Sequence, residues 1–468
     1  MEMTMKNNGL GKVMGILFLC LLTAMPSTAQ TYRLQQLKDS ALHNNIAIRN
    51  AKYGIEAAQQ QRKEAFTKYF PNISGTGLWF NANKGMAQMD INLSEQVSPE
   101  LAAALAQMLP PEALAALANP MSISMMKNGT VAGITATQPV FAGGQIVNGN
   151  KLAKIGEEAA ELQLQLSENE VEKTVEQYFW QLVSMQEKLK TIAAVDTLLA
   201  DIHKDVDVAV RAGVAMRNDL LQVQLRRNDL ESQKAKLQNG LSIVKLLLGQ
   251  YCGLTNDDHF DIVPPDMELQ NQTLPLFDAE GAGVPLLAEY QLLQKQVEAT
   301  KLQKQMTVGE NLPTVAVGAG YNYHNLLENN RTFGMVFATV SIPISNWWGG
   351  SHAIKRKKIE HQKAIEEQQD KSELLKIRMR NAWNNVTESF RQMEIAKSSI
   401  EQAEENLRLN RNYYKAGTSK MSDLLEAQLL YQQAHDGYVE AFANYQNRLL
   451  EYRQASPMAS QPSSVSTR

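Results

Sequence analysis

Apolar residues recur at alternating steps of four and three along two long stretches of the chain. In the first stretch the series is Val171, Val175, Tyr178, Leu182, Met185, Leu189 and Ile192. In the second, with Ser389 as its one polar member, it is Met379, Ala382, Val386, Ser389, Met393, Ala396, Ile400, Ala403 and Leu407. Sustained four-three spacing predicts long helices in left-handed coiled-coil packing.

Glycines mark both ends of each stretch. The first runs from Gly143-Gly144 to Ala212-Gly213, and the second runs from Gly349-Gly350 to Ala416-Gly417. From just after the double glycine, each is about 67 residues long, or about 100 Å if it is helical throughout. Glycine commonly ends a helix in a left-handed conformation, so we expect the chain to reverse at both Ala-Gly pairs.

Apolar periodicity resumes after both reversals. Residues 219–248 and 423–453 are predicted to return as helices, which gives one antiparallel hairpin in each half of the chain. Shorter helices are expected at 34–69 and 285–306.

Four further runs alternate apolar and polar residues with a period of two, at residues 72–81, 130–140, 314–324 and 332–342. In the third run, Val317 and Tyr321 share a face, while Gly318 and Gly320 lie on the other. Apolar residues on one face and small or polar residues on the other, over about ten positions, are typical of a transmembrane β-strand. A soluble sheet with one wet face fits the same alternation.

Four strands cannot close a barrel, because a bacterial barrel has at least eight and an open edge cannot face lipid. If the strands span a membrane, several chains must share one barrel. Three chains would supply twelve strands, although the sequence alone also allows two or four.

The two halves share a motif. Ala-Gly, five residues, Asp-Leu-Leu, two residues and Gln-Leu begins at Ala212 and again at Ala416, about 204 residues later. Such self-similarity predicts an internal duplication. We expect a first repeat at 30–251, a connecting segment at 252–283, a second repeat at 284–454 and a disordered tail at 455–468.

The N-terminus resembles a secretory signal, expected at residues 1–29. Lys6 and Lys12 precede a short apolar run, and small residues precede Gln30. Cys20 is a weak candidate for lipidation because the bulky Leu19 precedes it. Outside the signal only Cys252 remains, so no disulfide framework is possible.

Composition narrows the function. A net charge of −3 over 468 residues gives no polyanion-binding signature, so nucleic acid is not an expected partner. No catalytic, phosphate-loop or metal-ligand motif occurs, so no enzymatic activity, cofactor or metal site is predicted. An insertion at 82–129 contains Met86, Met89, Met108, Met121, Met125 and Met126. Thioethers suit Cu(I), but methionine is more often a packing residue.

Together, the duplicated arrangement, the element Gln138-Pro-Val-Phe-Ala-Gly-Gly144 and the two turn motifs resemble the TolC-like outer-membrane efflux proteins over residues 34–453. The resemblance implies an α+β membrane protein of the Gram-negative outer membrane that extends into the periplasm. Its hairpins would form a helical α-barrel, and four transmembrane strands per chain would complete a shared β-barrel in a homotrimer. The insertion 82–129 would be extracellular.

The resemblance also implies a function. The chain would be a passive exit duct for a tripartite efflux pump or a type I secretion system. Its partners would be a periplasmic adaptor and an inner-membrane pump of the resistance-nodulation-division or ABC type. The competing interpretation is a periplasmic coiled-coil adaptor or scaffold without a channel, which would also contain long hairpins.

Two acidic residues fall where the family places its constricting carboxylates. Asp423 and Glu426 are three residues apart and hence on one helix face. Symmetry would repeat them as acidic rings that select cations. Alternatively, acids near a helix start simply complement the helix dipole.

By the same resemblance, Asp219 and Tyr414 match members of an inter-helix latch that holds the tunnel shut. Ser419 stands where the family's well-known member has an arginine, so the latch is either weaker or shifted to the neighbouring Lys420. The expected adaptor-docking tips are Ala212, Gly213, Val214, Ala416, Gly417 and Thr418.

Membrane lipid is a further expected partner. Lys355-Arg356-Lys357-Lys358 follows the last strand, and Trp347-Trp348 lies just before it, where interfacial aromatics belong. Either lipid phosphates or solvent could face this basic run.

Overall fold

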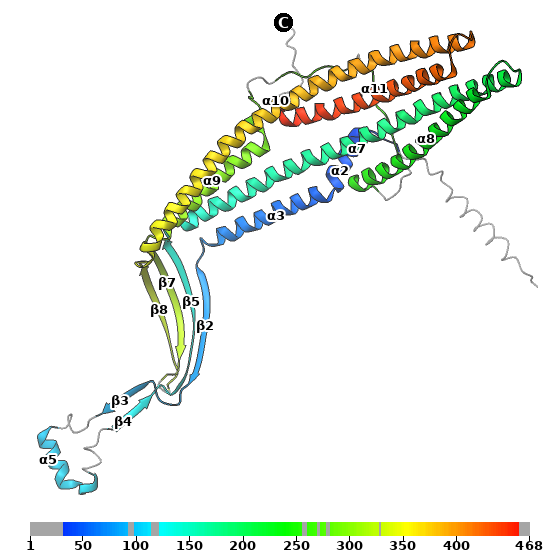
Figure 1. Cartoon of the computed structure of the whole chain (residues 1–468). Coiled ribbons are helices and arrows are strands. Elements are labelled where there is room, and N and C mark those ends of the chain that lie inside the picture. Colours follow the sequence, from blue (N-terminus) through cyan, green and yellow to red (C-terminus); the bar gives the residue numbers. More distant parts are fainter. Residues whose placement is uncertain are drawn as a thin grey trace, which may run out of the picture. The chain divides into compact units, whose positions relative to one another are not determined.

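The computed structural model describes most of the chain as two compact units (Figure 1). The described residues are 31–91, 98–113, 121–254, 260–268, 272–277, 281–326 and 329–457. The first unit consists of Met1–Ile55, Ala160–Leu292 and Gln368–Arg468, and the second of Glu56–Ala159 and Leu293–Glu367. The predicted signal, 1–29, and nearly all of the predicted tail lie outside the described residues.

The second unit contains a four-stranded antiparallel sheet in the order β2-β5-β7-β8. Its strands are β2 (Asn72–Asn81), β5 (Asn128–Phe141), β7 (Thr314–His324) and β8 (Arg331–Ser341). The period-two prediction is confirmed for all four, to within two residues at each end. The β5–β7 register shifts between Pro139 and Phe141, because proline has no N–H to donate to the ladder.

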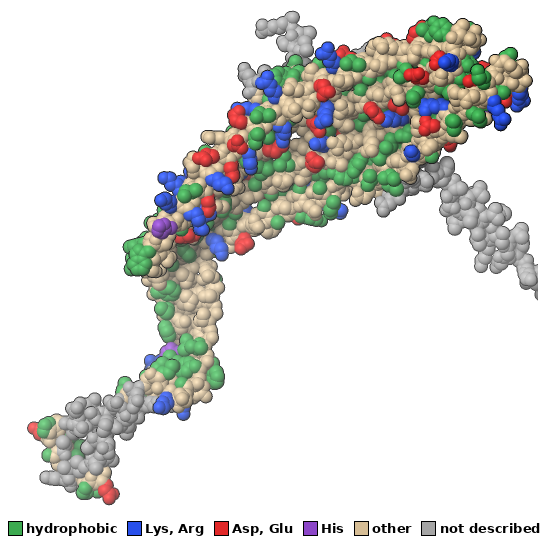
Figure 2. Space-filling model, in the orientation of Figure 1, with side chains coloured by type: hydrophobic (Ala, Val, Ile, Leu, Met, Phe, Trp, Pro, Cys, Tyr) green, Lys and Arg blue, Asp and Glu red, His purple; other side chains and the backbone are tan. Residues whose placement is uncertain are grey.

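One face of the sheet is apolar and exposed. Cross-strand pairing places Ile134 opposite Tyr321 and Ala319 opposite Val336, and Tyr321 and Val336 are 63% and 86% exposed. On its visible face Figure 2 shows hydrophobic and uncharged side chains over the sheet, whereas both signs of charge cover the helices. The four strands contain a single formally charged residue, Arg331, at the first position of β8.

The opposite face is less uniform than expected. It is small and polar along β7, but β8 places Phe333, Met335 and Phe337 on it. A Cβ at Gly318 would lie 2.3 Å from the Phe337 ring. Gly318 therefore gives the Phe337 ring room on this face, and the prediction that small residues line it is wrong for β8.

Two helical hairpins dominate the first unit, as predicted. They are formed by α7 (Gln145–Arg211) with α8 (Arg217–Cys252) and by α10 (Asn346–Lys415) with α11 (Met421–Ala455). Helix α7 begins where expected, after Gly143 and Gly144 with φ angles of 59° and 75°. Helix α10 begins earlier than expected, so Gly349-Gly350 lies inside it. Gly350 allows the Asn311 side chain to pack closely, because a Cβ there would lie 1.7 Å from its Oδ1.

The predicted helix at 34–69 is two helices, α2 (Leu34–Asn44) and α3 (Ile46–Thr67). Asn45 interrupts them because its side chain serves as a cap. Its Oδ1 accepts from Ala47 N at 2.8 Å, and its Nδ2 donates to Tyr251 O at 3.0 Å. The expected helix at 285–306 is α9 (Ala288–Gly309), which follows the short turn η2 (Val284–Leu286).

The connecting segment is anchored to the helices. Strand β6 (Asp261–Ile262) pairs in parallel with β1 (Thr31–Tyr32). Three tyrosines of α11, spaced by seven residues, donate hydrogen bonds to backbone carbonyls of the connecting segment. These bonds run from Tyr438 to Met267 (2.6 Å), from Tyr445 to Thr273 (2.8 Å) and from Tyr452 to Leu276 (2.8 Å). Their rings lie in the main core with Phe179 and Phe442.

The insertion contains β3 (Ala87–Ile91), β4 (Met121–Met125) and α5 (Pro99–Met108). Ser98 caps α5 by accepting from Leu101 N, and Pro99 occupies the first turn, as predicted. The Ala-Leu stretch after Pro111 lies mainly outside the described residues. Among the described helices, none is long and apolar enough to cross a membrane.

Candidate functional site: the hairpin turns and the helices that follow them

Both hairpins reverse through the same backbone turn. Gly213 and Gly417 have φ angles of 75° and 74°, a left-handed conformation that favours glycine. In each turn, the residue after the glycine donates to a carbonyl five residues earlier, Val214 to Ala209 and Thr418 to Tyr413. This pattern satisfies the last carbonyls of α7 and α10.

An aspartate caps the helix that follows each turn. Asp219 Oδ2 accepts from Met216 N at 3.3 Å, and Asp423 Oδ2 accepts from Lys420 N at 3.1 Å. Asp423 also accepts from Ser422 Oγ at 3.1 Å. Both aspartates thus stabilise a helix start, as the helix-dipole alternative for Asp423 requires.

Asp423 and Glu426 are both exposed on one face of α11. Their neighbours Leu424 and Ala427 are buried. A carboxylate pair on an exposed helix face is free to meet solvent or another chain, which the proposed acidic ring needs.

A cavity of about 790 Å³ separates the two turns. Its lining includes three predicted latch residues, Asp219, Tyr414 and Lys420, together with Ser419. Burial raises the pKa of the Tyr414 phenol, and the negative charge of Asp219 raises it further. The structure therefore brings the predicted latch residues into one cavity, although among the described residues no hydrogen bond joins Tyr414 to Asp219.

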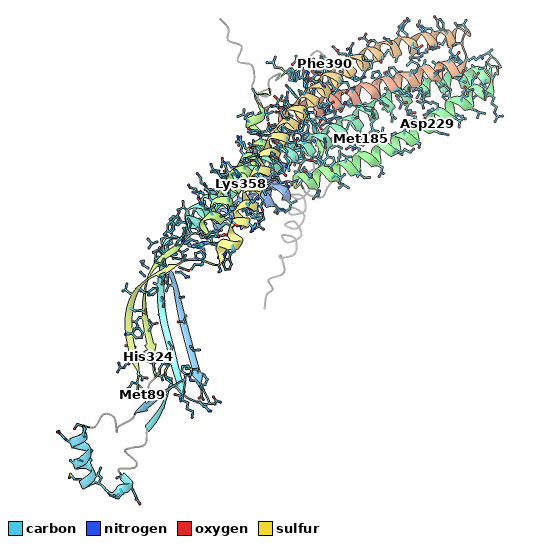
Figure 3. All side chains as sticks on the ribbon, turned by 60° about the vertical axis from the view of Figure 1, so that its left-hand side comes forward. Met89, Met185, Asp229, His324, Lys358 and Phe390 are labelled. Atoms are coloured by element: carbon cyan, nitrogen blue, oxygen red, sulfur yellow. The ribbon has the colours of Figure 1, made fainter. Side chains whose placement is uncertain are left out.

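A polar network between α8 and α11 was not predicted. Arg226 of α8, whose side chain is 13% exposed, donates from Nε to Gln428 Oε1 at 2.9 Å and from Nη2 to Gln432 Oε1 at 2.8 Å. Its Nη1 donates to Asp229 Oδ2 at 2.6 Å, and Gln432 Nε2 donates to Gln233 Oε1 at 2.9 Å. Asp229 is labelled on α8 in Figure 3. Arg226 thus joins the two hairpins through groups that are almost entirely buried on α11.

The sequence held a signal for this network. The apolar spacing of α11, read backward from Phe442 through Tyr438, reaches Gln428 at an expected core position. A buried amide needs a hydrogen-bonding partner, so a polar group on a facing helix could have been inferred. Its identity as Arg226 could not.

A half-buried carboxyl lies further along α11, at Asp436. Burial raises the pKa of the Asp436 carboxyl to about 6, Glu440 acts in the same direction and Lys188 opposes them. Lys188 is itself paired with Glu440. Asp436 therefore favours its neutral form more than an exposed aspartate does.

The methionines of the insertion differ in exposure where they are described. Met86, Met89 and Met108 are exposed, Met125 and Met126 are half-buried, and the side chain of Met121 lies outside the described set. In the described part of the chain, no group of three or more His, Cys, Asp or Glu could hold a metal ion.

Comparison with known proteins gives a family match for part of the chain and a fold for nearly all of it. Residues 287–456 match the family described as outer membrane efflux protein. No curated protein sequence matches the chain significantly.

Solved outer-membrane proteins share the fold at low identity. VceC of Vibrio cholerae is 13% identical with a TM-score of 0.69, over 90% of this chain and 95% of that one. The CmeC channel of Campylobacter jejuni is 14% identical with a TM-score of 0.70, over 90% and 85%. CusC, described in terms of transmembrane channel formation, is 14% identical with a TM-score of 0.75, over 92% of each chain. Residues 287–456 thus match the outer membrane efflux protein family, and the chain shares the fold of these solved outer-membrane proteins.

Proposed function

We propose that this chain is the subunit of an outer-membrane channel that three copies form together. The observation that carries the proposal is the sheet β2-β5-β7-β8. Its exposed face is apolar, and its four strands hold one formally charged residue, Arg331, at an end. Exposing such a surface to water is energetically unfavourable, whereas placing it against lipid acyl chains is favourable.

The edges of the sheet support assembly. Among the described residues, β2 and β8 each pair with only one strand. Unpaired backbone groups cannot face hydrocarbon, so β8 of one copy must pair with β2 of the next until the barrel closes. Three copies would give a twelve-stranded barrel, the assembly expected for this family.

The helical hairpins are proposed to extend into the periplasm, where their turns dock on an adaptor. Val214 and Met216 at the first turn are 80% and 74% exposed, and exposed apolar residues of this kind often mark interaction surfaces. The second turn, with Gly417 and Thr418, would present a more polar docking surface. Together these turns are the proposed adaptor contact.

The same hairpins are proposed to close the duct. Asp423 and Glu426 would form acidic rings around the bore in the trimer and favour cations. Arg226 with Gln428 and Gln432 would hold α8 to α11 and thereby resist opening, together with the cavity that contains Asp219, Tyr414 and Lys420.

The proposed duct is passive and catalyses no reaction, as expected for this channel family. Export would be driven by an inner-membrane pump of the resistance-nodulation-division or ABC type, for small molecules or for secreted proteins. Drug susceptibility and the secreted proteins of a deletion strain would separate these two cargo classes.

The test of assembly is the mass and location of the full-length protein. We expect outer-membrane fractionation, a trimer by light scattering in mild detergent, and a change in gel migration on heating as the barrel unfolds. A monomer that remains in the soluble periplasmic fraction would overturn the proposal and favour a coiled-coil adaptor. Planar-bilayer recordings of the trimer then test for a water-filled bore.

A further inference from the structure

A groove lies where α3 approaches β2, beside the first turns of α7. It has a volume of about 590 Å³, and its lining includes Arg62, Lys63, Phe66, Tyr69, Val147 and Lys151. All of these residues belong to the second unit. None has a role in the gate or in the docking turns.

The apolar part of the groove is aromatic and open to solvent. Phe66 and Tyr69 are 56% and 41% exposed, and their ring centroids are 5.6 Å apart. Phe70 lies 5.6 Å from Phe66 in an edge-on arrangement, but it lines a neighbouring cavity and not the groove. Amphipathic and aromatic rings gather at membrane–water interfaces, so this cluster suits the boundary of a lipid phase.

The charged part of the groove is basic. Arg62 forms an ion pair with Glu157 at 2.7 Å. Lys154 forms an ion pair with Glu158 at 3.5 Å, and Lys295 pairs with the same carboxylate. Within the part of the chain that the structure describes, Lys63 and Lys151 have neither an ion pair nor a hydrogen bond. Two uncompensated ammonium groups therefore flank an aromatic floor.

The groove lies on the lipid-facing side of the proposed barrel. A second cavity at the same junction is lined by Asn72 and Pro139. These two residues alternate with the outward residues, so they lie on the face of the sheet opposite Ile134 and Tyr321. Ala65 and Lys68 of α3 line that cavity, whereas Phe66 and Tyr69 line the groove. Asn150 lines both hollows, which therefore adjoin, but they take different residues from α3 and its end.

The groove also lies at the depth of a headgroup. Tyr69 precedes the first residue of β2, Asn72, by only three positions. If β2 enters the hydrocarbon at its start, the Lys63 and Lys151 ammonium groups lie at the phosphate level of the periplasmic leaflet.

We propose that this groove binds an anionic phospholipid of the periplasmic leaflet. Lys63 and Lys151 would contact the phosphate, and Phe66 and Tyr69 would cover the glycerol and the first acyl carbons. Ammonium groups bind phosphates as point charges, and basic residues at a membrane surface attract anionic lipids. The inference rests on the proposed outer-membrane location.

The basic run that the sequence singled out is a weaker site. Lys357 and Arg356 both pair with Glu360, at 2.6 and 3.8 Å. Lys358, labelled in Figure 3, and Lys355 remain without an ion pair among the described residues. Half of that run is thus already compensated within its own helix.

The test is native mass spectrometry of the full-length trimer, titrated with phosphatidylglycerol or with phosphatidylcholine as the zwitterionic reference. We expect phosphatidylglycerol to bind about tenfold more tightly to the unaltered protein. Lys63→Gln with Lys151→Gln should remove this preference. Lys204→Gln with Lys236→Gln removes two exposed lysines of the helical hairpins and should leave it intact.

Each remaining outcome is decisive. An unchanged preference in trimers of the Lys63→Gln/Lys151→Gln variant overturns the site, as does full displacement of the lipid by millimolar inorganic phosphate, which would indicate a free-anion site. Phe66→Ala with Tyr69→Ala should weaken the binding of both lipids, because the rings contact the glycerol and the first acyl carbons, which both lipids have. Because binding is read only on assembled trimers, failure of this inference is distinct from failure to form a channel.

Discussion

The α7–α8 turn and the α10–α11 turn have the same backbone and different side chains. Both have a left-handed glycine, and in both an aspartate caps the following helix. The first turn continues with Val214 and Met216, whereas the second continues with Thr418 and Lys420. Reversal of the chain thus constrains the glycine and the aspartate, and leaves the other positions free to differ in function.

Helices α8 and α11 differ more than the turns that precede them. With the two motifs aligned, Arg226 of α8 corresponds to Leu430 of α11, and Gln222 corresponds to Glu426. Arg226 is the centre of a nearly buried network, whereas Leu430 is 44% exposed. Arg226, the cation that connects the two hairpins, is therefore on α8, whereas the residues of the proposed acidic ring are on α11.

The largest effect is expected from Arg226→Ala, which breaks the connection between the hairpins. The change leaves the buried oxygens of Gln428 and Gln432 without their donor, at a cost of about 3 kcal/mol. We expect a lower thermal midpoint by circular dichroism and a higher open probability in planar bilayers. Leu430→Ala, at the aligned position, should change neither, and an equal response of the two variants would contradict the asymmetry.

Asp436 is a further difference between the two hairpins, because the aligned residue of α8 is the uncharged Ser232. With its pKa raised to about 6, the folded state keeps a proton that the unfolded state loses from about pH 4 upward. Stability therefore falls between about pH 4 and pH 6, and the full penalty applies above pH 6. Asp436→Asn should raise the free energy of unfolding at pH 7.5 by about 1.5 kcal/mol, after allowance for partial solvent access.

Thermal unfolding at pH 4 and pH 7.5 checks this expectation. The Asp436→Asn variant should exceed the parent at pH 7.5 and match it near pH 4. Ser232→Asn is the control in the other hairpin, and any change that it makes in thermal stability should be the same at both pH values. If Asp436→Asn raised the stability equally at both pH values, the gain would come from packing and not from the raised pKa of Asp436.

The shared backbone itself predicts equal costs for Gly213→Ala and Gly417→Ala. No atom lies within 4 Å of a Cβ built at either glycine, so the penalty comes only from the left-handed backbone, at about 1 kcal/mol each. Chemical denaturation of the two variants measures it. Costs that differ by more than a few tenths of a kcal/mol would show that one turn is held by contacts that the other lacks.

Much of the fold follows from local pattern. Strands β2 and β7 have the predicted ends because their alternation stops at turn residues, and α7 begins after glycines that have a left-handed backbone. The same glycine rule failed at Gly349-Gly350, where the doublet has an ordinary helical backbone and Gly350 makes room for Asn311. The break at Asn45 was missed because it depends on a carbonyl about 200 residues away, on Tyr251.

The candidate site divides in the same way. Gly213, Gly417 and the two capping aspartates could be located from spacing, because each acts within one turn of its own helix. Arg226 could not, because its partners on α11 lie 202 and 206 positions away. A residue whose role depends on such distant partners requires the fold before its role can be assigned.

The smallest expected effect concerns the proposed acidic ring, and it separates the two roles of Asp423. Asparagine keeps an oxygen that can accept from Lys420 N, so Asp423→Asn with Glu426→Gln removes the charge and preserves the helix cap. If the carboxylates form the ring, single-channel conductance should change by about two- to threefold and cation selectivity should fall, at unchanged thermal stability. Glu388→Gln with Glu394→Gln removes two exposed charges from α10 and should alter neither property. Unchanged conductance and selectivity in the first variant would leave Asp423 as a cap alone, equivalent to Asp219, and the two hairpins would then differ in Arg226 but not in charge at the bore.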